Sequence, residues 1–178
     1  MRVIAIEALG SFHHKHLIPV FIKALQDTSS SVRKEAVIAL KMRAELKGEF
    51  DLVNHLQPLL LDINSEVCQQ AVLAMGCMKD SSAIRALFDI LKVQNAPLFI
   101  KEEAVRALNW NNSLIALDYL ESCLYSSDIM LIQEIVCVLG RQELIELKSY
   151  ATKILIDFLN SDTEINHQSG IKQLVAPS

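Results

Sequence analysis

One stretch of this sequence decides its fold: Val32-Arg33-Lys34-Glu35-Ala36-Val37-Ile38-Ala39-Leu40. Its apolar and small side chains recur at intervals of three and four residues, at Val32, Ala36, Ala39 and Leu40. This spacing places them along one side of an α-helix. The small residues within that stripe allow a neighbouring helix to approach closely. The stretch therefore predicts a helix that packs against other helices.

The same pattern recurs along the whole chain at a narrow period. Aligned on the residue that opens the apolar core of each copy, the anchors are Ala5, Ala36, Ala71, Ala104, Ile135 and Gly170. Subtracting each anchor number from the next gives spacings of 31, 35, 33, 31 and 35 residues. Periods of roughly 20–50 residues are typical of proteins built from stacked repeats.

Each copy is followed by a second stretch with an apolar face at helical spacing. These stretches are Leu17–Gln26, Leu52–Leu61, Ala83–Lys92, Leu114–Leu124 and Leu144–Leu159. Residues 27–31, 62–65, 126–128 and 160–163 are rich in Ser, Asp, Asn and Thr, whose oxygens accept from the free amides of a new helix. In the junction at residues 93–97, Pro97 suits the first turn of the next helix.

Two helices of about a dozen residues cannot bury their apolar stripes alone, whereas stacked hairpins bury them continuously. We therefore predict an all-α fold, an α–α superhelix (α-solenoid) of about five hairpins and a partial sixth, in one domain spanning residues 1–178. The units fall at about 1–27, 28–62, 63–93, 94–126, 127–161 and, as the partial unit, 162–178. Pro58 lies inside a predicted second helix, where proline costs about 3 kcal/mol, so we expect a kink or a late start there.

The repeated helix resembles the first helix of the HEAT-like repeat class that was first grouped with the phycobilisome (bilin) lyases. The resemblance lies in the pattern Val32-Arg33-x-x-Ala36-Val37-x-Ala39-Leu40, in the closing glycines Gly10, Gly76 and Gly140, and in the turn aspartates Asp27 and Asp62. It implies a HEAT-like solenoid over essentially the whole chain. The class contains scaffolds, regulatory subunits and lyase subunits, so the resemblance leaves function open.

Composition and charge limit what the protein can do. The net charge of −4 excludes a positive field over the whole chain that would attract nucleic acid. No run of about 18 apolar residues is present, so we expect no membrane span, and the N-terminus is no secretory signal. The four cysteines form no C-x-x-C pair, which favours reduced thiols and a cytoplasmic protein.

The ends of the sequence lack the polar face that terminal repeats normally carry. Met1 stands where other copies have Val32 or Ile100, and the chain closes on Ala176-Pro177-Ser178. We interpret the sequence as a segment of a longer repeat protein or as one whose ends a partner covers. Exposed end faces would also favour self-association.

No pattern in the sequence predicts catalysis, a cofactor or a metal site. The densest group of potential ligands, His13-His14-Lys15-His16, has no cysteine or carboxylate beside it and is interpreted as an exposed polar turn. Trp110, the single tryptophan, falls in the short turn predicted for the fourth unit. Two interpretations stay open for it: a plug packed onto neighbouring hairpins, or an anchor for a partner, since tryptophan is enriched in binding hot spots.

The second helices of a solenoid usually line its concave face, so their polar residues are the candidates for partner contact. With Trp110, the predicted partner-binding residues are Lys23, Asn54, Gln57, Arg85, Asp89, Asp118, Glu121 and Lys148. Their charges are mixed in sign, which suits a protein partner better than a phosphate backbone. We therefore favour a protein-interaction scaffold over an enzyme. The alternative, implied by the resemblance, is a bilin lyase or chaperone subunit.

Overall fold

A computed structural model describes residues 1–43, 50–78 and 80–168, and for residues 162–168 it describes the backbone alone. Within this part, the first helix of each hairpin, called the A helix, is α1 (Arg2–Gly10), α3 (Ser30–Lys41), α5 (Ser65–Cys77), α7 (Leu98–Trp110) or α9 (Ile129–Gly140). The second, or B, helices are α2 (Ile18–Ala24), α4 (Leu52–Leu56), α6 (Ser81–Lys92), α8 (Leu114–Cys123) and α10 (Ile145–Gln168). Short 3-10 helices, η1 (Lys15–Leu17) and η3 (Gln57–Leu61), flank α2 and α4.

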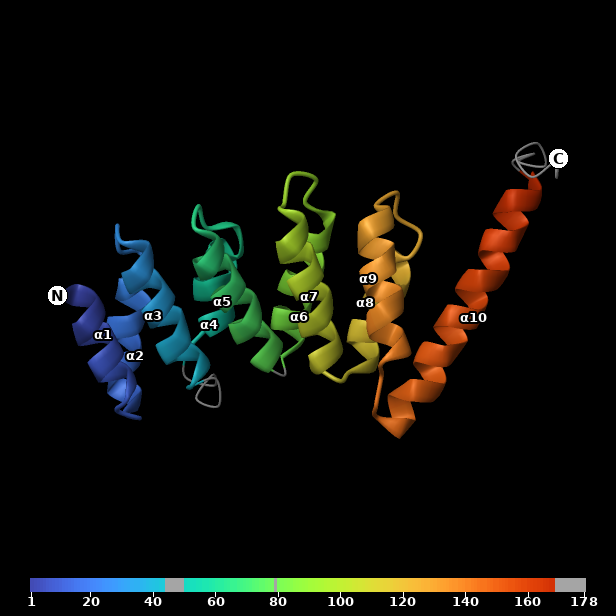
Figure 1. The fold of residues 1–178 in the computed structure, drawn as a ribbon. Helices are drawn as coiled ribbons and strands as arrows, with labels where there is room; N and C mark the ends of the chain where they lie inside the picture. The colour runs from blue at the N-terminus through green and yellow to red at the C-terminus, as the bar shows by residue number, and fades with distance from the viewer. Residues whose placement is uncertain (44–49, 79, 169–178) are drawn as a thin grey trace.

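The hairpins stand side by side in a single row, with the A helices in front and the B helices behind them (Figure 1). The turns that join one unit to the next lie along the upper edge, called the inter-unit edge. The turns within hairpins lie along the lower edge, called the hairpin edge. All regular structure in the described residues is helical. The predicted all-α solenoid is confirmed.

The A helices pack against one another through buried residues, and they approach most closely where these are small. The anchors Ala36, Ala71, Ala104 and Ile135 are all fully buried. A Cβ placed on Gly76 would lie 2.9 Å from the Cβ of Ala107 in the next A helix, closer than real side chains approach. Full burial of a Leu, Ile, Val or Met contributes about 1.5–3 kcal/mol, so this stacked core is the main source of stability.

Arg33 joins two consecutive turns on the inter-unit edge. Its Nε and Nη2 donate to the carboxylate of Asp62, each at 2.7 Å. Its Nη1 donates to the backbone carbonyls of Asp27, at 2.8 Å, and Thr28, at 3.3 Å. Both charged side chains are buried, with 11% of Arg33 and 6% of Asp62 exposed. The turn before α3 and the turn before α5 are therefore held by one guanidinium.

The same pairing recurs in other units with less burial. Arg2 donates to Asp27 through Nε and Nη2, and Lys101 lies 3.5 Å from Asp128. In the third unit, Cys68 stands at the position where the first, second and fourth units carry the basic residue. The following turn, at residues 93–97, contains no aspartate. Both partners of the pair are thus replaced together, so that neither charge is left unpaired there.

A second set of contacts crosses between units at the hairpin edge. The contacts are made by three buried polar residues, each seven positions after the anchor of its unit: Arg43, Asn111 and Gln142. Arg43 donates to the carbonyls of Gly10 and Phe12 in the preceding unit. Asn111 Nδ2 donates to the carbonyl of Met78 at 3.3 Å, and Gln142 Nε2 to Asn109 Oδ1 at 3.1 Å. The sequence analysis did not anticipate these bonds.

Two predictions about helix boundaries have different outcomes. The interruption expected at Pro58 is confirmed, because α4 ends at Leu56 and the chain continues as the 3-10 helix η3. The turn predicted at residues 160–163 is wrong, because α10 continues as helix through it to Gln168. Residues 160–163 contain neither the proline nor the glycine that commonly ends a helix. Most of the predicted partial sixth unit, including its anchor Gly170, lies outside the described residues.

The four cysteines are free thiols. Cys68 and Cys123 are buried, and burial raises the pKa of both thiols, which makes them poor nucleophiles. Cys77 and Cys137 are exposed. Among the described helices, none is both long and apolar enough to cross a bilayer.

The contact between Gly76 and Ala107 should make Gly76→Ala destabilising. Overpacking of a tight helix contact costs about 1–3 kcal/mol, although alanine favours helix. Denaturant unfolding should show this loss, and adding Ala107→Gly should recover part of it. The matched control is Gly140→Ala, because a Cβ there meets nothing within 4 Å. Equal effects of the two glycine substitutions would contradict the packing described.

Replacing Asp62 with asparagine should lower stability at neutral pH far more than at acid pH. Hydrogen bonds from Arg33 hold the pKa of the Asp62 carboxyl below its usual value. The stabilisation is therefore complete above the pKa of an unfolded aspartate, about 3.9, and is lost as pH falls through the lower folded pKa. Asp62→Asn should cost about 1–3 kcal/mol at pH 7, because Arg33 is left buried without a counter-charge.

Urea unfolding at pH 7 and at about pH 3 measures this difference, which should shrink at the lower pH. Asp89→Asn is the control, since Asp89 is exposed and makes no ion pair with another described residue. A pH-independent effect of Asp62→Asn would show that the charge of Asp62 does not matter.

Candidate functional site

The predicted partner-binding residues other than Trp110 lie on the B helices or, for Gln57, on the 3-10 helix η3. All except the half-buried Glu121 are exposed: Lys23, Asn54, Gln57, Arg85, Asp89, Asp118 and Lys148. Asp118 accepts a hydrogen bond from the Tyr150 hydroxyl at 2.7 Å, and this bond raises the pKa of Tyr150 to about 12. That contact ties α8 to α10. Lys23, Arg85 and Asp89 make no hydrogen bond or ion pair with other described residues.

Trp110 lies apart from these residues. It is the last residue of the A helix α7, at the hairpin edge, and 52% of it is exposed. A tryptophan this exposed is not a plug packed between hairpins, so that interpretation is wrong. The role of Trp110 as an anchor for a partner stays a prediction.

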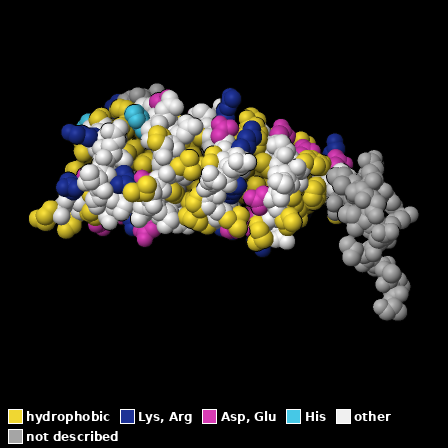
Figure 2. Space-filling model, turned by 90° about the horizontal axis from the view of Figure 1, so that it is seen from above, with side chains coloured by type: hydrophobic (Ala, Val, Ile, Leu, Met, Phe, Trp, Pro, Cys, Tyr) yellow, Lys and Arg dark blue, Asp and Glu magenta, His cyan; other side chains and the backbone are white. Residues whose placement is uncertain are grey.

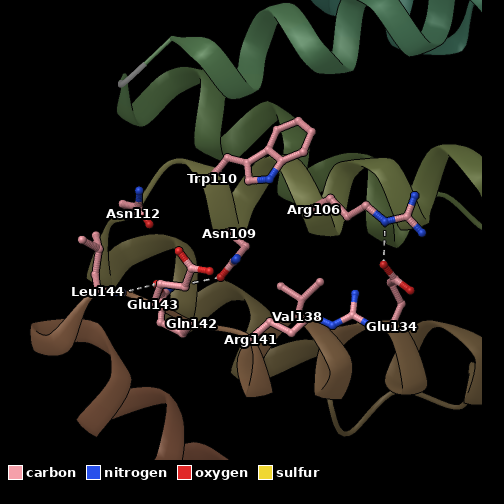
Figure 3. Close-up of a pocket in the computed structure, with 10 residues that line it drawn as sticks. All are labelled: Arg106, Asn109, Trp110, Asn112, Glu134, Val138, Arg141, Gln142, Glu143 and Leu144. Atoms are coloured by element: carbon pink, nitrogen blue, oxygen red, sulfur yellow. Dashed lines mark hydrogen bonds and ion pairs between the residues drawn. The ribbon is translucent and has the colours of Figure 1, made fainter.

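Trp110 borders a pocket of about 510 Å³ between two consecutive A helices. Figure 3 shows Trp110 on one wall and Val138 on the other, with the Arg106–Glu134 pair at one end and Asn112 and Leu144 at the other. The residues that line it come from α7, α9 and the turns that follow them: Arg106, Asn109, Trp110, Asn112, Glu134, Val138, Arg141, Gln142, Glu143 and Leu144.

The turns beside the pocket are held by local hydrogen bonds. Asn112 adopts a left-handed backbone with φ 53°, which asparagine tolerates better than most residues, and this turns the chain away from α7. Gln142 binds Asn109 Oδ1 through its Nε2 and accepts from the amide of Leu144 at 3.2 Å. Gln142 is itself buried. The wall opposite Trp110 is therefore preformed.

The charged side chains that line this pocket are balanced, with Arg106 and Arg141 against Glu134 and Glu143. Arg106 Nε donates to Glu134 at 2.7 Å and its Nη1 to Glu103 at 3.1 Å. The hydrogen bond to Glu134 is the main reason that the pKa of Arg106 is raised. Glu143 adds a further carboxylate against the exposed Arg141. The pocket combines the indole surface of Trp110, amide groups and charged groups of both signs.

The histidines at residues 13–16 lie in the first hairpin, far along the chain from the Trp110 pocket. His14 and His16 are exposed and their rings stack with centroids 5.2 Å apart. In the part of the chain that the structure describes, no three His, Cys, Asp or Glu side chains converge in a way that could hold a metal ion.

An apolar patch that was not predicted from the sequence lies on the inter-unit edge. It consists of the exposed side chains Leu98, Phe99, Ile129 and Met130, at the starts of α7 and α9. The equivalent positions of earlier units are polar: Ser30, Ser31, Ser65 and Glu66. Figure 2 looks down on this edge and shows hydrophobic side chains gathered over its C-terminal half. Comparing equivalent repeat positions would have revealed the patch.

Comparisons with known proteins support HEAT-like repeats. Residues 1–75 match the family model for HEAT repeats. Among solved structures, the crystal structure of an engineered protein, a target of the Northeast Structural Genomics Consortium, is similar in fold. It is 21% identical, with a TM-score of 0.52 over 97% of this chain and 78% of that one.

That structure is informative about fold alone because its sequence identity is low. No curated protein matches this chain in sequence. The family match concerns HEAT repeats in general and does not extend to the phycobilisome-lyase subclass.

The exposure of Trp110 should be visible in its fluorescence. Because Trp110 is the only tryptophan, its emission reports this pocket without a background. Caesium and iodide ions should both quench it, since 52% of the residue is exposed and the charged lining residues are balanced in sign. Blue-shifted emission insensitive to both ions would contradict the exposure described for Trp110.

Proposed function

We propose that this protein is an interaction scaffold that binds another protein, with the Trp110 pocket as the principal anchor point. The observation that carries the proposal is a half-exposed tryptophan bordering a preformed pocket of about 510 Å³. Exposed aromatic side chains in such pockets commonly contribute most of the binding energy of an interface.

The chemistry around Trp110 indicates what the partner presents. Glu143, at the rim of the pocket, can pair with a basic side chain of the partner. A lysine or arginine could lie over the indole ring, where a cation gains about 0.5–2 kcal/mol. The asparagine amides beside it can pair with the backbone of an extended segment.

The exposed B-helix residues provide a second, flatter contact surface. HEAT repeats generally bind proteins along extended faces. Arg85 and Asp89 lie one helical turn apart on α6 and are open to a partner. This surface supports the role of a scaffold that contacts its partner over several units. The cytoplasmic location stays a prediction, and no described residue favours the lyase alternative.

A photo-crosslinking residue placed at position 110 in cells should trap the partner, whose affinity can then be measured with purified proteins. Trp110→Ala should weaken binding at least tenfold, because a hot-spot aromatic contributes about 2 kcal/mol or more. The chain should stay folded by circular dichroism, since half of the Trp110 surface is already in water.

Phe12→Ala is the matched control. Phe12 is an aromatic residue on the same edge, 55% exposed, in the first unit. If Phe12→Ala and Trp110→Ala lowered the affinity for the partner equally, the Trp110 pocket would not be the anchor point. If charge reversal at Arg85 and Asp89 also left the affinity unchanged, the scaffold face on the B helices would be excluded.

A further inference from the structure

The outer face of the first hairpin is an apolar groove. It lies between α1 and α2 and has a volume of about 700 Å³. Its walls include Ala5, Ile6, Leu9, Val20 and Ala24, with Lys23 at the same face. This surface is distinct from the Trp110 pocket, which lies between the fourth and fifth units.

Two alanines on α1 are exposed, although the equivalent alanines on α3, α5 and α7 are buried. Ala5 and Ala8 are exposed. Their equivalents at the anchor, Ala36, Ala71 and Ala104, are fully buried, and those three residues later, Ala39, Ala74 and Ala107, are at most 3% exposed. In the later units these positions face the preceding hairpin, as the contacts of Ala39 with Gly10 and of Ala107 with Gly76 demonstrate.

Arg33, which is equivalent to Arg2 in the second unit, makes hydrogen bonds to backbone carbonyls that Arg2 does not make. Arg33 uses Nε and Nη2 for an aspartate and Nη1 for two carbonyls of the preceding inter-unit turn. Arg2 makes the first set with Asp27, but its Nη1 donates to none of the described residues. Its side chain is 67% exposed, against 11% for Arg33.

The shape and the free donor match one type of occupant. We propose that this face binds a further helical hairpin of the same repeat type. Its A helix would pack on Ala5 and Ala8, and its inter-unit turn would offer two backbone carbonyls to Nη1 of Arg2. The support is continuity with the interfaces between the described units, which use the same repeat positions. A capping face would carry polar residues where this one carries alanine.

The test appends such a hairpin in the register of the repeat. A copy of residues 28–66 is joined directly to Met1 of the full chain, because Met1 is equivalent to Val67, which follows Glu66. In this fusion the backbone of the copied Asp62 and Ile63 takes the position that Asp27 and Thr28 hold beside Arg33. A second fusion carries residues 63–99, ending at Phe99 before the Met1 equivalent Ile100.

Hydrogen exchange and denaturant unfolding then report docking. At least one fusion should unfold in a single transition at a higher midpoint than the unfused chain. Amides of α1 should exchange at least tenfold more slowly. Ala8→Glu should leave the unfused chain unchanged, because Ala8 is exposed, but should abolish both gains in the fusion. Arg2→Ala should reduce them.

Two results would overturn the proposal. One is that both fusions leave the exchange of α1 unchanged, with the added hairpin unfolded or melting separately. The other is a dimer of the unfused chain, seen by sedimentation, that Ala8→Glu dissociates, since this would assign the face to a second copy. Neither result bears on Trp110, so the proposed partner site is tested independently.

Discussion

The A helices α5 and α7 approach so closely that Gly76 has no room for a Cβ against Ala107. A hairpin of two short helices buries its apolar stripe only against its neighbours, so every unit depends on such helix contacts. The contacts between neighbouring A helices therefore determine which polar groups meet at the two edges.

Polar contacts between units reinforce these helix contacts at both ends of the A helices. Arg33 on the inter-unit edge and Arg43 on the hairpin edge each bind backbone carbonyls of the preceding unit. Buried polar groups are costly unless every partner is in place, so a hairpin displaced along its neighbour would lose these bonds. Their role is to select one arrangement of the stack, while apolar burial supplies most of its stability.

The features that indicate function lie where the later units depart from the repeat. Trp110 and the apolar patch of Leu98, Phe99, Ile129 and Met130 belong to the fourth and fifth units. At the patch positions the second and third units carry serine or glutamate. Positions that violate the local pattern of a fold without a packing reason are commonly functional. The regular units thus position an irregular surface, and fold alone does not identify its partner.

The sequence by itself determined the helical hairpins, their period, and the interruption at Pro58, because these depend on side-chain spacing and backbone chemistry within a few residues. It also predicted that Lys23, Arg85 and Asp89 are exposed, as they are. Local patterns cannot report which groups meet across units roughly 25–35 residues apart in sequence. Only the tertiary structure decided that Arg33 bridges two turns, that Asn111 and Gln142 bind the preceding unit, and that α10 continues through residues 160–163. The exposure of Trp110 was likewise decided there, because it depends on how neighbouring hairpins are offset in the stack.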